Sequence, residues 1–509
     1  MGWHLTGWHD VRRDTINVVL SGLLVQLIGF LKLLLIARYF GTSAEIDGYY
    51  LALAIPAVFQ GFATGALQTG FLPIYVSLRS KHQYRRAERL VSAVFYRLVP
   101  MLLVVSLLFS LFSKEIIVWL TPASSAAVQE AAAAGFRILS FTILGNGLID
   151  YVSLILNAHH RYVAAALGPG LNAAVASMML LLWPEWGLDN LIYGLVIGML
   201  AQLFLLLAIM GRKRIGMGMA SFVWQDPDLK RVYWLTLPIL LGVALVNANN
   251  TVIQFFAAVT GDGGVSTLGY ASRLHGVFLQ VVVIGVSAVL LPNLAEMLAR
   301  KRRAQIHALL RNAFFMSLTI GIVMVTTVDV MGMDIVTLLL QRGQFGPGES
   351  RRVALVWLIY TFGLFPIAWG VFIGKYFQAA QRPWTITRLA VLSFAANTTL
   401  AWLLLQSHGL NGLAAASGLA YLLVAIGYHR AMMRDLGMGV LVGESGRILT
   451  LLAMGLAGWY CIHLLQLVIL ELPLLVRIAI NTIPIMALAM LLALRAGFVF
   501  RSAGSSLTP

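Results

Sequence analysis

A few charged residues lie inside long apolar runs of the sequence, where a charge is costly and usually serves a function. Lys32 and Arg38 lie in the first such run, and Arg273 lies in the eighth. Cations in these positions favour an anionic ligand, so we expect Lys32 and Arg273 to line a shared cavity. The alternative for Lys32 and Arg38 is that they extend to the membrane surface or pair with Glu45 or Asp47.

Other polar residues also interrupt the apolar runs. Asp150 follows Asn146 in the fourth run. It is expected either to bind a coupling cation or proton, or to pair with a basic residue of a neighbouring helix. In the seventh run, Asn247, Asn250 and Gln254 place amides near mid-membrane. These amides either hydrogen-bond neighbouring helices or recognise sugar hydroxyls.

The sequence contains no constellation typical of an enzyme. His159 and His160 are adjacent, which is a poor geometry for chelating a metal, and Gly41-Thr42-Ser43 is not a phosphate-binding loop. We therefore expect no catalytic residue, no metal site and no cofactor, apart from a possible coupling ion or the membrane potential. We therefore do not expect this chain alone to form an ATP-driven pump.

Composition explains why these residues must be held by membrane helices. Of 509 residues, 60% are hydrophobic and only 11% are charged, whereas soluble proteins carry about 25% charged residues. The net charge of +16 falls in clusters between apolar runs, so membrane lipids, not nucleic acid, are the expected partners. About fourteen spans of roughly 20 residues are predicted, near 15–39, 48–77, 91–112, 131–157, 163–183, 188–210, 231–259, 265–294, 307–328, 353–378, 384–405, 409–429, 447–468 and 474–497.

The chain also repeats itself. Leu72-Pro73 recurs as Leu291-Pro292, and Gly48-Tyr49 recurs as Gly269-Tyr270, an offset of about 220 residues that indicates two similar six-helix lobes. The predicted fold is therefore an all-α polytopic membrane protein with two six-helix lobes and two C-terminal helices. The expected parts are an N-terminus (1–14), an N-lobe (15–212), a linker (213–231), a C-lobe (232–434), spans thirteen and fourteen (435–500) and a tail (501–509).

Basic residues set the expected orientation, because short cytoplasmic loops are rich in Lys and Arg. Lys and Arg cluster in every other loop between the predicted spans, as in 79–89, 212–214 and 300–303. One loop departs from this alternation, because it contains Arg342, Arg351 and Arg352 although its neighbours predict few basic residues there. Both termini are thus expected to be cytoplasmic. The polar start lacks the apolar core of a signal peptide. The linker is expected to be either a helix in the membrane interface or a solvated connector.

Several motifs together resemble the MurJ/MviN family of the multidrug/oligosaccharidyl-lipid/polysaccharide (MOP) exporter superfamily. They are Gly29–Gly41, Asp47–Tyr50, Ile55-Pro56, Phe71–Ile74, Tyr270–Leu274, Leu290–Pro292 and Gln341–Phe345. The resemblance covers essentially the whole chain. It implies a flippase that moves an undecaprenyl-pyrophosphate-linked saccharide from the cytoplasmic to the periplasmic leaflet of the bacterial inner membrane by alternating access. Cell-envelope synthesis proteins are possible partners.

The resemblance also assigns roles to individual residues. Lys32 and Arg273 would hold the pyrophosphate, Arg38 and Asp47 would close the periplasmic gate, and a groove near spans thirteen and fourteen would hold the polyprenyl tail. Gln26 and Gln60 stand where arginines are expected, and Gly276 stands where an acidic residue is expected.

These departures favour an exopolysaccharide repeat unit as cargo over lipid II, the alternative. The sites expected to bind substrate are thus Lys32, Arg273, Gln26, Gln60, Asn247 and Asn250. An ion-coupled exporter of cationic drugs and a non-transporting scaffold are less favoured.

Overall fold

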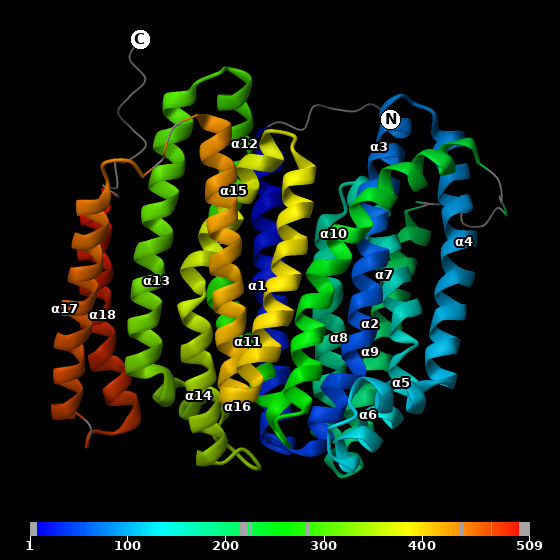
Figure 1. Cartoon of the computed structure of the whole chain (residues 1–509). Coiled ribbons are helices and arrows are strands. Elements are labelled where there is room, and N and C mark those ends of the chain that lie inside the picture. Colours follow the sequence, from blue (N-terminus) through cyan, green and yellow to red (C-terminus); the bar gives the residue numbers. More distant parts are fainter. Residues whose placement is uncertain are drawn as a thin grey trace. The chain divides into compact units, whose positions relative to one another are not determined.

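The computed structural model describes residues 8–213, 215, 222, 226–280, 285–437, 439, 441–469 and 471–497. This part of the chain is built of helices joined by short turns, with no strand among the described residues (Figure 1). The all-α polytopic fold predicted from composition is confirmed.

The first half of the chain runs through nine α-helices. They are α1 (Trp8–Phe40), α2 (Ala44–Ala66), α3 (Leu72–Ser80), α4 (Tyr84–Leu111), α5 (Ser113–Leu120), α6 (Ala126–Leu139), α7 (Thr142–Ala158), α8 (Tyr162–Leu182) and α9 (Gly187–Arg212). A π-helical turn, η1 (Leu67–Phe71), joins α2 to α3, and a short 3-10 helix, η2 (Pro184–Trp186), precedes α9.

The second half adds nine more helices. They are α10 (Pro227–Ala258), α11 (Gly264–Leu279), α12 (Gly285–Ala299), α13 (Arg303–Leu340), α14 (Pro347–Phe362), α15 (Leu364–Ala379), α16 (Pro383–Leu436), α17 (Ser445–Ile469) and α18 (Leu474–Arg495). Of the linker, residues 227–231 form the start of α10, and most of the remainder lies outside the described residues.

By length and composition, nine helices of the described chain can cross a membrane, or eleven if the bent pairs α6–α7 and α14–α15 each form one span. In the part of the chain that the structure describes, the fourteen ranges expected from the sequence nevertheless all correspond to helices. The number of expected spans exceeds the number of spanning helices partly because α16 is counted as one helix. It contains two expected spans, 384–405 and 409–429, and its backbone breaks where the second begins, at Gly409, whose φ is 55°. The ranges of spans seven and eight fall on α10 and on α11 with α12, which are not among the nine.

The internal repeat is visible in the backbone. Four tight turns each place a non-glycine residue at positive φ, and the two amides that follow the helix donate to carbonyls three and five residues back. This arrangement is the Schellman motif that ends many helices. The residues are His82, His160, Lys301 and Gln381. The last two follow the first two at the offset of about 220 residues found in the sequence.

The chain separates into two compact units. The first comprises Met1–Ser266 with Arg342–Phe345, and the second comprises Thr267–Gln341 with Gly346–Pro509. Helix α10 belongs to the first unit because it packs on α2, where Thr251 donates to the carbonyl of Ala54 at 3.1 Å. In the second unit, α17 and α18 pack on each other and on α13 (Figure 1).

Candidate functional site

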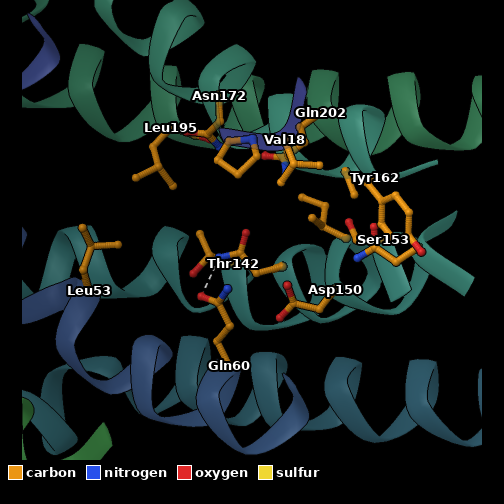
Figure 2. A pocket seen from close by; sticks show the side chains of 16 residues that line it. Val18, Leu53, Gln60, Thr142, Asp150, Ser153, Tyr162, Asn172, Leu195 and Gln202 are labelled. Carbon is orange, nitrogen blue, oxygen red and sulfur yellow. Dashed lines mark hydrogen bonds between the residues drawn. The ribbon is translucent and has the colours of Figure 1, made fainter. Parts of the chain in front are cut away.

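A polar stripe runs along α7 and faces a cavity of about 540 Å³ in the first unit (Figure 2). Residues spaced by three or four positions share one face of a helix, and these five follow that spacing. They are Thr142, Asn146, Asp150, Ser153 and Asn157. Because each is polar and most other residues of α7 are apolar, this helix gives the cavity a wall of hydrogen-bonding side chains.

Four other helices complete the walls of this cavity. Helix α1 contributes Val18, α2 contributes Gln60, α8 contributes Asn172 and α9 contributes Gln202. Figure 2 shows Gln60 and Asp150 pointing toward each other from α2 and α7. The site therefore collects amides from elements that are distant in the sequence, as expected of a cavity that binds a polar ligand or ion within a helical bundle.

Asp150 is the acidic residue of this cavity. Its Oδ2 shares a hydrogen bond with the hydroxyl of Thr64, while the side-chain oxygen of Gln60 accepts from Asn146 at 3.3 Å. Among the described residues, no lysine, arginine or histidine forms an ion pair with Asp150. The sequence left two possibilities for Asp150, a bound cation or proton and an ion pair with a basic neighbour. The described residues contain no such ion pair.

Asp47 occupies a second site in the first unit. It lies in the first turn of α2 with only 1% of its surface exposed. Its carboxylate accepts from the backbone amides of Gly263 at 2.8 Å, Ser266 at 2.7 Å and, at a longer 3.4 Å, Val265. These amides belong to the start of α11, whose first N–H groups have no partner inside the helix. Asp47 therefore binds the start of α11 to α2.

Arg38 lies near the end of α1, with an exposed side chain. Its backbone oxygen accepts from the amide of Gln344 at 2.9 Å, so the segment Arg342–Phe345 packs on the first unit. Gly343 has φ of 61°, and a Cβ there would lie 2.3 Å from the Arg38 oxygen. The segment can approach α1 this closely because position 343 has no side chain.

The expected substrate-binding residues have different environments. In α1, Lys32 is half-buried and Gln26 is exposed, and each contacts a neighbouring group. Asn250 is exposed on α10, and the side chain of Asn247 lies outside the described residues. Arg273 is exposed on α11 of the second unit. These placements leave the roles of Lys32, Arg273, Gln26, Asn247 and Asn250 as predictions.

The second unit contains an apolar groove of about 410 Å³ between α13, α14, α15 and α17. Leu318, Ile322 and Leu456 are among its lining residues, and Asp329 lies at the groove as a polar residue. The Asp329 carboxylate accepts from the indole nitrogen of Trp459 at 2.7 Å. The groove thus offers a mainly hydrocarbon surface beside the C-terminal hairpin.

Sequence reasoning identified Gln60 and Asp150 separately but missed their neighbours Thr64, Asn172 and Gln202. Two signals in the sequence could have found part of the set. Gln60 and Thr64 are four residues apart in α2, and the stripe on α7 has helical spacing throughout. A polar stripe inside an apolar run marks a helix face that does not contact lipid.

The fold is similar to solved transporter structures. A lipid II flippase MurJ in an inward closed conformation superposes with a TM-score of 0.79 at 19% identity, covering 94% of this chain and 99% of that chain. An inward-facing multidrug resistance MATE family transporter of the MOP superfamily gives 0.69 at 14% identity, covering 81% and 95%. This chain thus has the polytopic helical fold that those two solved structures share.

The particular family follows from the sequence comparisons. The family model described as lipid II flippase MurJ matches residues 36–477. A probable lipid II flippase MurJ of Rhizobium meliloti (strain 1021) is 28% identical over 403 residues, which is 77% of this chain and 75% of that protein. One from Thermotoga maritima is 24% identical and covers 81% and 83%. The chain belongs to the MurJ family, as the sequence motifs predicted.

Proposed function

We propose that this chain moves lipid II from the cytoplasmic to the periplasmic leaflet of the bacterial inner membrane. The observation that carries the proposal is the family match over residues 36–477, together with relatives that are described as probable lipid II flippases. These matches favour lipid II over the exopolysaccharide repeat unit expected from Gln26, Gln60 and Gly276. The departures at those positions are then variations within a lipid II flippase.

Binding of the cargo would use the cationic and amide groups of α1, α10 and α11. Lys32 and Arg273 supply positive charge for the pyrophosphate, and Arg suits this role because its planar fork matches phosphate oxygens. Gln26, Asn247 and Asn250 supply hydrogen bonds to the saccharide. A cavity of this kind lets a polar headgroup cross without entering hydrocarbon.

Alternating access also needs a gate that closes the periplasmic side. Asp47 supports this role because it holds the start of α11 against α2 through three backbone amides. Arg38 supports it because its backbone receives the segment Arg342–Phe345. Opening the gate would require these hydrogen bonds to break together.

The polyprenyl tail would lie in the apolar groove between α13 and α17. Its hydrocarbon lining gives the tail an environment similar to lipid, so the tail need not follow the headgroup through a polar cavity. An inside-negative membrane potential favours the outward step, since moving one negative charge outward gains about 2.3 kcal/mol per 100 mV.

Complementation tests the cargo. The unmodified chain should restore growth to a bacterial strain depleted of its essential lipid II flippase. A chain with Arg273→Ala, inserted in the membrane to the same level, is the matched control and should fail. If the unmodified chain is inserted normally and does not restore growth, lipid II is not its cargo, and the exopolysaccharide interpretation is favoured.

A further inference from the structure

Asp150 is a carboxylic acid inside the membrane-spanning part of the first unit without a charged partner. Among the described residues, its side chain interacts with the hydroxyl of Thr64 and the amide of Gln60, and no cation lies beside it. An ionised carboxylate in such a place is costly unless a cation compensates it. The group therefore needs either a bound cation or a proton.

The hydrogen bonds around Thr64 favour a proton. The Thr64 hydroxyl lies 2.9 Å from the backbone oxygen of Gln60 and also shares a hydrogen bond with Asp150 Oδ2. A hydroxyl has a single hydrogen to donate, while a backbone oxygen and an ionised carboxylate can only accept. Both bonds form together if Thr64 donates to Gln60 and the neutral acid of Asp150 donates to Thr64.

The side chain beside Asp150 supplies no counter-charge. Gln60 lies beside Asp150 in the cavity (Figure 2), and its side chain is an uncharged amide. An arginine at position 60 would reach Asp150 and hold it ionised. The glutamine has no charge to offer, so the carboxyl group of this chain is free to take up a proton.

We propose that Asp150 is a reversible proton-binding site of the first unit and that its occupancy changes the hydrogen bonding of α2. On protonation, solvent hydronium gives its proton to Asp150 Oδ2 and becomes water, and the new O–H donates to Thr64. On release, the proton returns to water, and the Thr64 hydroxyl turns from the Gln60 oxygen toward the carboxylate. The net change is one proton bound or released.

Helix α2 connects this site to the gate. Thr64 lies in its last turn, directly before the π-helical turn η1, while Asp47 lies in its first turn. Loss of the bond from Thr64 removes one of the hydrogen bonds to the Gln60 backbone oxygen, which lies in α2 about two turns before η1 begins at Leu67. Coupling of the proton to transport rests on the flippase proposed above, whereas proton binding itself does not.

The other groups around Asp150 do not titrate in the same way. Helix α1 presents Val18, α2 presents Gln60 and Thr64, and α9 presents Gln202, none of which ionises. Tyr162 of α8 is the other titratable side chain that lines the cavity, and its phenol has no carboxyl C=O group. A carboxyl signal from this cavity therefore reports Asp150.

Infrared difference spectroscopy of the full chain in nanodiscs tests proton binding directly. At low pH the native spectrum should contain a protonated-carboxyl C=O band that is lost as the pH rises and that is missing from Asp150→Asn at every pH, while the other carboxyl groups of the chain give a background common to both. Gln60→Arg should also lack it, because the guanidinium keeps Asp150 ionised. Ser177→Ala, a neutral change on α8 of the same unit at a residue that hydrogen-bonds within its own helix and does not line the cavity, should retain the band.

Identical spectra from the native chain and Asp150→Asn would overturn the proposal. Displacement of the band by added Na⁺ at constant pH would overturn it as well, because the site would then hold a metal cation. Flipping is measured separately. On one limb of its pH profile the flipping rate should vary about tenfold per pH unit, the slope of one titrating proton, in the native chain and in Ser177→Ala but not in Asp150→Asn or Gln60→Arg. Because the infrared band does not depend on transport, failure of the flippase proposal leaves the proton site testable.

Discussion

The contact between Asp47 and the start of α11 gives the sharpest test of the gate. Replacing Asp47 with Asn preserves its shape but converts one accepting oxygen into an NH2 group, which faces a backbone N–H instead of binding it. Hydrogen bonds to a charged group contribute about 1.5–3 kcal/mol each. Losing one of the two short bonds to Gly263 and Ser266, and weakening the other, should therefore destabilise the contact by about 3 kcal/mol.

Hydrogen–deuterium exchange of the chain in nanodiscs measures this change. A difference of about 3 kcal/mol corresponds to a loss of protection of roughly a hundredfold at the amides of 263–266. Glu45→Gln is the matched control, because Glu45 is an exposed carboxylate in the same turn of α2. Equal protection in Asp47→Asn, Glu45→Gln and the native chain would show that the carboxylate does not hold this segment.

Two further predictions concern charge and orientation. Arg273→Ala or Lys32→Ala should abolish flipping in a protein that still inserts in the membrane. Arg273→Lys should keep part of the activity, because the positive charge survives without the bidentate fork of the guanidinium. Flipping at the wild-type rate by Arg273→Ala would contradict its role in binding the pyrophosphate. In a Cys461→Ser background, which removes the exposed native thiol, an impermeant external reagent should label Asp262→Cys but not Lys81→Cys. The reverse labelling would invert the proposed topology.

The sequence alone determined the class of protein and most of its helices. Apolar runs of spanning length predict membrane helices because an unpaired backbone cannot be exposed to hydrocarbon. Over the residues that the structure describes, all fourteen expected ranges correspond to helices. The repeat was visible as well, and turns such as those at His82 and Lys301 show it again in the backbone. Asp150 was conspicuous because a carboxylate inside an apolar run is rare.

Only the tertiary structure decided which groups these residues contact. Asp47 accepts from amides more than two hundred positions later in the chain, and backbone amides leave no signal in the sequence. Asp150 meets Thr64 because α2 and α7 pack together, and this contact with a hydroxyl could not be read from the sequence, which left open a basic partner or a bound cation or proton. Helix α10 joins the first unit through its contacts with α2, although the repeat counts it with the second lobe. Periodicity fixes which face of a helix is polar, but packing between distant helices fixes what that face meets.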